Sequence, residues 1–234
     1  MSIHPLLHTL RSQKREHISG GLYESLLYRM TYHSNRIEGC LLDPNTVRGI
    51  LTRGVVQASE PVRVSDVLET CGHARALTYC IDTAEESLTD EYILHLHALL
   101  KMGQEDSGVY KTRRNVIGMT MTSDPKDVPA HMHTLLTEYT ALSSPTFEDI
   151  VDFHYRFERI HPFQDGNGRV GRLIAFKECL RAGIVPFFIA DTKKHFYYRG
   201  LHEYPTQPGF LRETCADGQD TVRALMTHFE VPEK

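Results

Sequence analysis

Residues 161–172 read HPFQDGNGRVGR and carry more chemical information than any other stretch of this chain. His161, which can accept a proton, lies four positions before Asp165, a carboxylate that can bind a divalent metal. Gly-Asn-Gly follows, and such small residues let successive backbone N–H groups point at one anion. Arg169 and Arg172 lie three positions apart, on one face of a helix. The stretch predicts a helix that begins at its glycines and a site where a hydroxyl is activated against a polyphosphate.

Each side chain of this stretch suits one role at such a site. His161 would be neutral at cytosolic pH and would take the proton of the incoming hydroxyl. Asp165 would hold Mg²⁺ against two phosphates, and Arg169 and Arg172 would bridge phosphate oxygens bidentately. A surface loop with ion pairs and turn glycines is the alternative, but it gives no reason for all these residues in this order.

Composition narrows the class of protein. The 234 residues carry a net charge of −4, and the isoelectric point is near 6.4. We therefore expect no nucleic-acid partner, since a nucleic-acid-binding domain usually carries a basic surface. The five cysteines form no CxxC pair and indicate reduced thiols. Without a signal peptide or a membrane-spanning apolar run, we expect a cytoplasmic protein with no membrane partner.

Hydrophobic periodicity predicts an all-α fold. The expected helices cover 23–38, 44–54, 63–85, 89–102, 132–142, 147–161, 167–182, 192–203 and 219–230. A spacing of two at Ile117, Met119 and Met121 predicts one short β-hairpin inserted within about 108–121. We expect an N-terminal helical region over 1–88 and a core over 89–234, without a linker long enough to separate two domains.

The stretch 161–172 resembles the signature of the Fic (filamentation induced by cAMP) family, HxFx[D/E]GNGRxxR, at every fixed position. The segment 108–118 is similar to the flap hairpin of that family, although Lys111 stands where arginine is common. The segment 193–201 resembles the part of the family that carries a nucleotide-contacting tyrosine, here Tyr197. Together these similarities cover roughly residues 90–205.

The resemblance implies transfer of a nucleotide, most often AMP from ATP, to a Ser, Thr or Tyr hydroxyl of a target protein. His161 would be the general base, Asp165 would bind Mg²⁺, and Arg172 with Arg169 would hold the outer phosphates. The target would pair with the flap by β-augmentation. The other nucleotide-binding residues expected from the resemblance are Gly166, Asn167, Gly168, Asn115, Val116, Ile117, Gly118 and Tyr197.

A second stretch, SNRIEG at residues 34–39, resembles the inhibitory motif of the family, [S/T]xxxE[G/N]. It closes the expected helix at about 23–39 just before Gly39. Ser34 and Glu38 are four positions apart and therefore share a face of that helix. From there Glu38 can reach Arg172 and occupy the guanidinium that would hold the γ-phosphate. The alternative is that Glu38 is an ordinary surface residue at a helix end. We expect instead that Glu38 inhibits the site of its own chain.

Three classes of function remain open. The first is a Mg²⁺-dependent protein adenylyltransferase, for which transfer of another nucleotide is a variant. The second is a hydrolase that removes AMP from a modified protein, with Glu38 activating water. The third is a nucleotide-sensing module without turnover, in which His161 would have no role. The sequence names neither the target nor the oligomeric state, so auto-modification and a homo-oligomer stay open.

Overall fold

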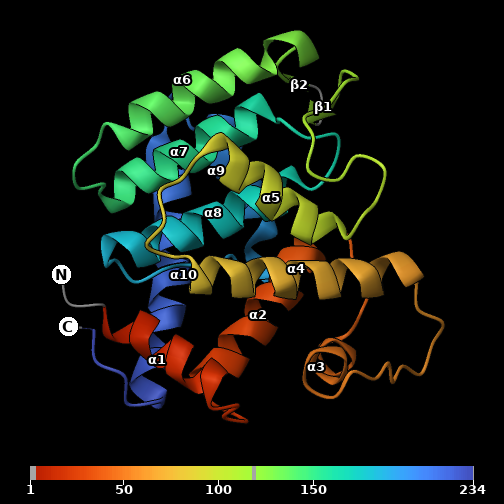
Figure 1. Cartoon of the computed structure of the whole chain (residues 1–234). Coiled ribbons are helices and arrows are strands. Elements are labelled where there is room, and N and C mark those ends of the chain that lie inside the picture. The colour runs from red at the N-terminus through yellow and green to blue at the C-terminus, as the bar shows by residue number, and fades with distance from the viewer. Residues whose placement is uncertain (1–3, 118–119, 234) are drawn as a thin grey trace.

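The computed structural model describes residues 4–117 and 120–233, and within them the regular secondary structure is helical apart from one pair of two-residue strands (Figure 1). The helices are α1 (Pro5–Arg15), α2 (Leu22–Ile37), α3 (Pro44–Arg53), α4 (Val64–Asp82), α5 (Asp90–Lys101), α6 (Val128–Thr140), α7 (Phe147–Ile160), α8 (Asn167–Ala182), α9 (Lys194–Glu203) and α10 (Pro208–His228). Two short 3-10 helices are η1 (Pro125–Asp127) and η2 (Asp191–Lys193).

Helix α8 is the central element of the fold. It packs against α7, α4, α5 and α2, and nearly all its side chains from Asn167 to Leu180 are buried. A helix that is buried on every side needs neighbours all round, and Figure 1 shows α8 crossing the middle of the molecule. The first turn of α8, which contains the predicted site, is consequently held by the whole helical framework.

Helix α7 leads directly into the site. Its N-terminus has a capping box, in which the Thr146 hydroxyl accepts from the Asp149 N–H and the Asp149 carboxylate accepts from the Thr146 N–H. The helix ends at Ile160, and His161 follows in the left-handed conformation with φ of 53°. This terminus turns the chain back toward α8, so that the histidine and the glycines of 161–172 share one end of the α7–α8 pair.

The two strands lie within the segment for which a hairpin was expected. β1 (Val116–Ile117) pairs antiparallel with β2 (Thr120–Met121), and residues 108–115 form turns and irregular backbone. Strand pairing is thus much shorter than the expected range of 108–121. Gly118, which was expected to bind nucleotide, lies outside the described residues.

The N-terminal helices pack directly on the rest of the chain. α2 contacts α1, α3, α4 and α8, and the main apolar core contains residues of both 1–88 and 89–234. α10 begins at Pro208, well before the expected 219, because proline at the first position opens a helix rather than ending one.

No helix within 4–117 and 120–233 is long and apolar enough to cross a membrane.

Candidate active site

The loop between α7 and α8 is held by side-chain contacts to its own backbone. Asn167 accepts from the Phe163 N–H at 2.7 Å and donates to the Phe163 carbonyl at 2.8 Å. The Phe163 ring stacks on His97 of α5 with 3.8 Å between ring centroids. Gly166 has φ of 84°, a conformation that glycine adopts at little cost. The asparagine of Gly-Asn-Gly therefore shapes the loop, and the glycines beside it permit that shape.

A cradle for an anion lies at the first turn of α8. A Cβ atom on Gly168 would lie 2.9 Å from Nη1 of Arg172, so backbone and guanidinium approach closely there. Arg172 is 6 % exposed, and within the described residues its Nη1 has no hydrogen-bond partner. Unpaired N–H groups at a helix N-terminus attract negative charge. Together the turn and the guanidinium form a site for an anion.

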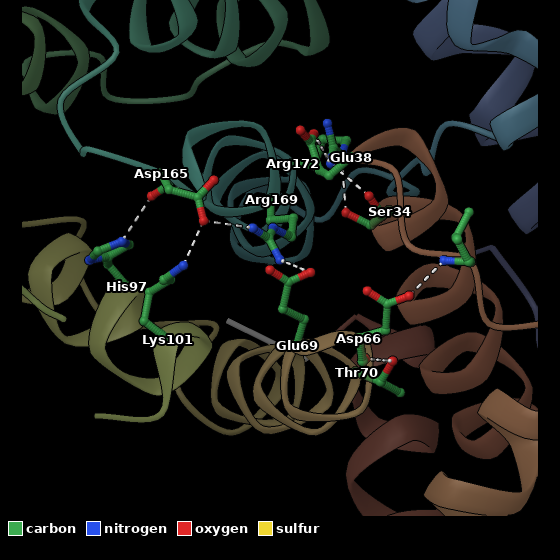
Figure 2. A network of polar contacts seen from close by, with 11 residues as sticks. Ser34, Glu38, Asp66, Glu69, Thr70, His97, Lys101, Asp165, Arg169 and Arg172 are labelled. Atoms are coloured by element: carbon green, nitrogen blue, oxygen red, sulfur yellow. Dashed lines mark hydrogen bonds and ion pairs between the residues drawn. The ribbon is translucent and has the colours of Figure 1, made fainter. Parts of the chain in front are cut away.

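The carboxylate of Glu38 lies in this cradle. Arg172 Nη2 donates to Glu38 Oε1 at 2.8 Å, and a Cβ on Gly168 would lie only 2.4 Å from the same oxygen. Ser34 adds two contacts, since its hydroxyl accepts from Arg172 Nε and its carbonyl from Nη2, both at 3.0 Å. Figure 2 shows Ser34 and Glu38 reaching Arg172 from α2 and its C-terminal cap. The structure thus contains the expected contact.

A pocket of ≈ 470 Å³ opens beside the cradle. Its lining includes His161, Gly168, Arg172 and Glu38, so the expected base and the expected phosphate site face one space. Burial is the main cause that lowers the pKa of His161 to about 4, and the charge of Lys111 acts in the same direction. The imidazole is accordingly neutral near pH 7 and able to accept a proton.

Asp165 lies outside this lining and takes part in a chain of charges. Its Oδ2 accepts from Lys101 Nζ at 2.5 Å and from Arg169 Nη2 at 3.3 Å (Figure 2). Nη1 of Arg169 also lies 2.9 Å from Oε2 of Glu69 on α4. Burial alone would raise the pKa of Asp165, but the hydrogen bond from Lys101 and the charge of Arg169 lower it overall.

Arg169 differs from Arg172 in its surroundings. Its side chain is 2 % exposed and is directed at Glu69 and Asp165, and it does not line the pocket. Its expected contact with outer phosphates stays a prediction, whereas its contact with the Asp165 carboxylate is present. The two arginines share a helix face in sequence, yet α4 and α2 give each a different acidic partner.

The strand segment, residues 111–122 with β1 and β2, is hydrogen-bonded to the loop between α7 and α8. Lys111 is 4 % exposed, and its Nζ donates to Asn115 Oδ1 at 2.7 Å and to Thr122 Oγ1 at 2.6 Å. The Asn115 amide donates to the Phe163 carbonyl at 3.0 Å. Asn115, which was expected to bind nucleotide, is thus occupied with bracing the loop, and the exposed side chain of Val116 lies next to it.

Tyr197 is buried at the wall of the pocket. Its hydroxyl lies 2.8 Å from Nε2 of His154, and Arg172 lies over its ring with 5.7 Å to the centroid. Glu158 lines the same pocket, and its burial raises its pKa to about 8. Sequence reasoning missed Glu158, although it lies only three positions before His161, in the last turn of α7.

Lys101 and Glu69 were also missed, for a different reason. They lie on α5 and α4, and they meet the motif only after the chain has folded. No local pattern around either residue points to Asp165 or Arg169.

Within residues 4–117 and 120–233, no group of three or more His, Cys, Asp or Glu side chains is arranged to hold a metal ion. A metal at Asp165 would therefore need further oxygen ligands from a bound substrate.

The sequence pattern of the Fic/DOC family matches residues 87–178. The chain is 29 % identical over 189 residues to the protein adenylyltransferase Fic of Nematostella vectensis, covering 75 % of this chain and 43 % of that protein. It is 28 % identical over 211 residues to the protein adenylyltransferase Fic of Drosophila virilis, covering 86 % of this chain and 40 % of that protein. The chain thus spans less than half the length of these relatives.

Solved structures show the same fold. A Fic domain-containing signaling protein from Bacteroides thetaiotaomicron matches with a TM-score of 0.73 and 24 % identity, over 95 % of this chain and 91 % of that chain. A Fic family protein from Desulfovibrio desulfuricans matches with a TM-score of 0.73 and 22 % identity, over 99 % of this chain and 78 % of that chain. At these identities the likeness is one of fold.

Proposed function

We propose that this chain, which carries a Fic domain, transfers AMP from ATP to a hydroxyl group of a target protein. One observation carries the proposal: a neutral His161 shares a pocket with the cradle formed by Gly168 and Arg172. Phosphoryl-type transfer depends mainly on positioning and on charge neutralisation, and both are supplied by this arrangement. Both relatives described above are named protein adenylyltransferases, which supports the choice of AMP.

In this reaction His161 takes the proton of the target hydroxyl as the oxygen attacks the α-phosphorus. The bond to the β-phosphate oxygen breaks, and pyrophosphate leaves. The depressed pKa of His161 keeps the imidazole free of a proton at neutral pH. General bases of this kind contribute typically ~10²–10⁴-fold to the rate.

The cradle holds the phosphates of ATP. Arg172 already binds one carboxylate, and that carboxylate lies against Gly168 of the first turn of α8, which supports the binding of a phosphate oxygen in its place. The planar guanidinium suits two oxygens at once, and its Nη1 has no hydrogen-bond partner within the described residues. We assign the γ-phosphate to Arg172. Arg169, directed at Asp165, acts mainly by fixing that carboxylate.

Asp165 suits Mg²⁺ on the chemistry of its donors. Its side chain is 60 % exposed, and both cationic partners contact the same oxygen, Oδ2. A single carboxylate with substrate phosphate oxygens is a common set of ligands for Mg²⁺. The bound ion would neutralise charge on the α- and β-phosphates. The residues of this chain supply the carboxylate, and Lys101 and Arg169 hold it at the loop between α7 and α8.

The target would dock on the strand segment. β1 and β2 are short and include the exposed side chains of Val116 and Met121, so a further extended segment could pair at their edge. The base of this segment is fixed to the loop through Lys111 and Asn115. A docked hydroxyl would consequently be placed relative to His161. A surface segment of a second copy is one such target.

Glu38 acts as the inhibitor in this proposal. While Glu38 occupies Nη2 of Arg172, the γ-phosphate cannot take both ends of the guanidinium, and ATP lies in an unproductive orientation. The second candidate, removal of AMP, is favoured by a different aspect of the same residue: the Glu38 carboxylate is 29 % exposed and lines the pocket, where it can activate a water molecule. We expect a change of Glu38 to raise transfer under the first proposal and to abolish hydrolysis under the second.

The experiment uses the Glu38→Gly variant with Mg²⁺ and ATP labelled at either the α- or the γ-phosphate. We expect label on protein from α-labelled ATP and none from γ-labelled ATP, since AMP retains only the α-phosphate. Label from the γ-position would identify phosphate transfer and contradict the proposal. For the second candidate, wild type and Glu38→Gly are incubated with AMP-modified protein, and release of AMP by wild type alone would favour hydrolysis.

A further inference from the structure

Lys101 is the last residue of α5, and the reaction just described gives it no role. Its side chain is only 8 % exposed, and its Nζ donates to Asp165 Oδ2 at 2.5 Å (Figure 2). Asp165 is the carboxylate assigned to Mg²⁺. A cation that belongs to the chain therefore already occupies one oxygen, Oδ2, of the expected metal ligand.

The framework on both sides keeps this contact in place. A Cβ on Gly72 of α4 would lie 2.0 Å from the carbonyl oxygen of Leu100, so α4 and α5 are in backbone contact just before Lys101. On the other side, the Asp165 carbonyl oxygen lies 3.1 Å from Nε2 of His97, and Nδ1 of that ring accepts from the Gly108 N–H at 3.0 Å. Exposed ion pairs on mobile side chains contribute little, but here both partners are positioned by buried structure.

The charges around Asp165 are balanced without a metal ion. Lys101, Asp165, Arg169 and Glu69 alternate in sign across α5, the active-site loop, α8 and α4. A divalent ion added at Asp165 would lie beside two cations, and the other carboxylate of this set, Glu69, already pairs with one of them, Arg169. A nucleotide triphosphate would bring further negative charge. The arrangement opposes a metal ion that arrives by itself and admits one that arrives with phosphates.

We propose that Lys101 holds the Asp165 carboxylate in place of the metal ion until nucleotide binds, so that Mg²⁺ enters with the triphosphate and not before it. This inference rests on the proposed function, which assigns the metal to Asp165. Lys101 then acts through Asp165 as a positioning residue. With Glu38 in the phosphate cradle and Lys101 on the metal ligand, each half of the resting site is neutralised by a side chain of opposite charge.

The test measures Mn²⁺ binding by electron paramagnetic resonance in the Glu38→Gly background, with and without a non-hydrolysable ATP analogue. Lys101→Met and Lys101→Gln each remove the charge, and the glutamine keeps a polar group. We expect both to bind Mn²⁺ roughly tenfold more tightly than the parent without nucleotide, since one neighbouring cation is gone. With the analogue bound, the difference should shrink to less than about threefold because phosphate charge dominates.

Two controls locate the effect. Lys14→Met removes another lysine that pairs with an acid, Asp82, far along the chain, and should leave Mn²⁺ binding unchanged. Adding Asp165→Asn to Lys101→Met should abolish the gain. Equal Mn²⁺ affinity of Lys101→Met, Lys101→Gln and the parent would overturn the inference, as would a loss of metal-free analogue binding, which would make Lys101 a phosphate ligand. If Asp165→Asn leaves Mn²⁺ binding with analogue intact, the metal assignment of the proposed function fails instead.

Discussion

Glu38 and Arg172 are joined by a hydrogen bond of 2.8 Å although 134 positions separate them in the sequence. The contact brings the C-terminal cap of α2 to the first turns of α8. Gly168 makes it possible, because any side chain there would meet the carboxylate oxygen at 2.4 Å. The anion-binding end of the central helix is consequently closed by an acid from the N-terminal part of the chain.

Ser34→Ala should release the inhibition in part. The Ser34 hydroxyl accepts from Arg172 Nε at 3.0 Å, and a buried hydrogen bond to a charged group contributes about 1.5–3 kcal/mol. Its loss leaves Glu38 as the main partner of the guanidinium, so we expect label transfer above wild type and below Glu38→Gly. Initial rates with α-labelled ATP measure this order. A rate equal to wild type would show that Ser34 does not help to hold Arg172.

His161→Ala in the Glu38→Gly background should remove transfer while ATP binding stays within about threefold. The imidazole acts on the target hydroxyl, so the loss should be roughly 10²–10⁴-fold in rate. Titration with a fluorescent ATP analogue measures binding, and label on protein measures transfer. Transfer at the parent rate would exclude His161 as the base.

Gly168→Ala in the Glu38→Gly background should weaken ATP binding, because the new Cβ would lie 2.9 Å from Arg172 Nη1 and would block approach to the backbone. Hydrogen bonds to charged groups contribute about 1.5–3 kcal/mol, so the loss should be roughly tenfold to a hundredfold. Gly209→Ala is the matched control, since a Cβ there meets nothing within 4 Å. Equal binding by both variants would remove the α8 N-terminus from the phosphate site.

Acid should destabilise the fold through two buried histidines. Burial, with the charge of Arg172, lowers the pKa of both His73 and His154 to about 3. The unfolded chain binds protons near pH 6.5 that the folded chain excludes, so this stability is present above pH 6.5 and is lost as pH falls toward 3. The slope is at most about 1.4 kcal/mol per pH unit for each histidine.

Urea unfolding at pH 7 and pH 5 measures this loss. In His73→Gln, which can still bond to Thr31, the free energy of unfolding should fall less between the two pH values than in wild type. The same fall in both proteins would show that His73 is not held neutral by burial.

Local patterns in the sequence predicted much of the fold. The helix end near His161 and the start of α8 within Gly-Asn-Gly each depend on neighbouring residues, and each is present. The start of α10 was predicted at 219, but the helix begins at Pro208, because proline is accepted at the first position of a helix. The strand pair was overextended, since the turn residues from Gly108 onward favour irregular backbone.

The candidate site was predictable where one short stretch supplies it. His161, Gly168 and Arg172 come together because α7 and α8 are joined by a short loop. Lys101 and Glu69 reach the same loop from α5 and α4, and their partners depend on how three helices pack. Contacts of this kind leave no periodic pattern in the sequence from which they could be predicted. The Glu38 contact was expected only through its resemblance to a known motif.

The most direct test of the account compares transfer of α-labelled AMP by wild type, Glu38→Gly, Arg172→Ala and the double variant, with urea unfolding of each to confirm folding. If Glu38 withholds Arg172 from the γ-phosphate, Glu38→Gly should raise the rate roughly tenfold or more, equivalent to about 1.4 kcal/mol of activation free energy. In the Arg172→Ala background the same change should give no gain, so the two effects are strongly non-additive. A Glu38→Gly variant no faster than wild type, or a gain of the same size without Arg172, would contradict the account.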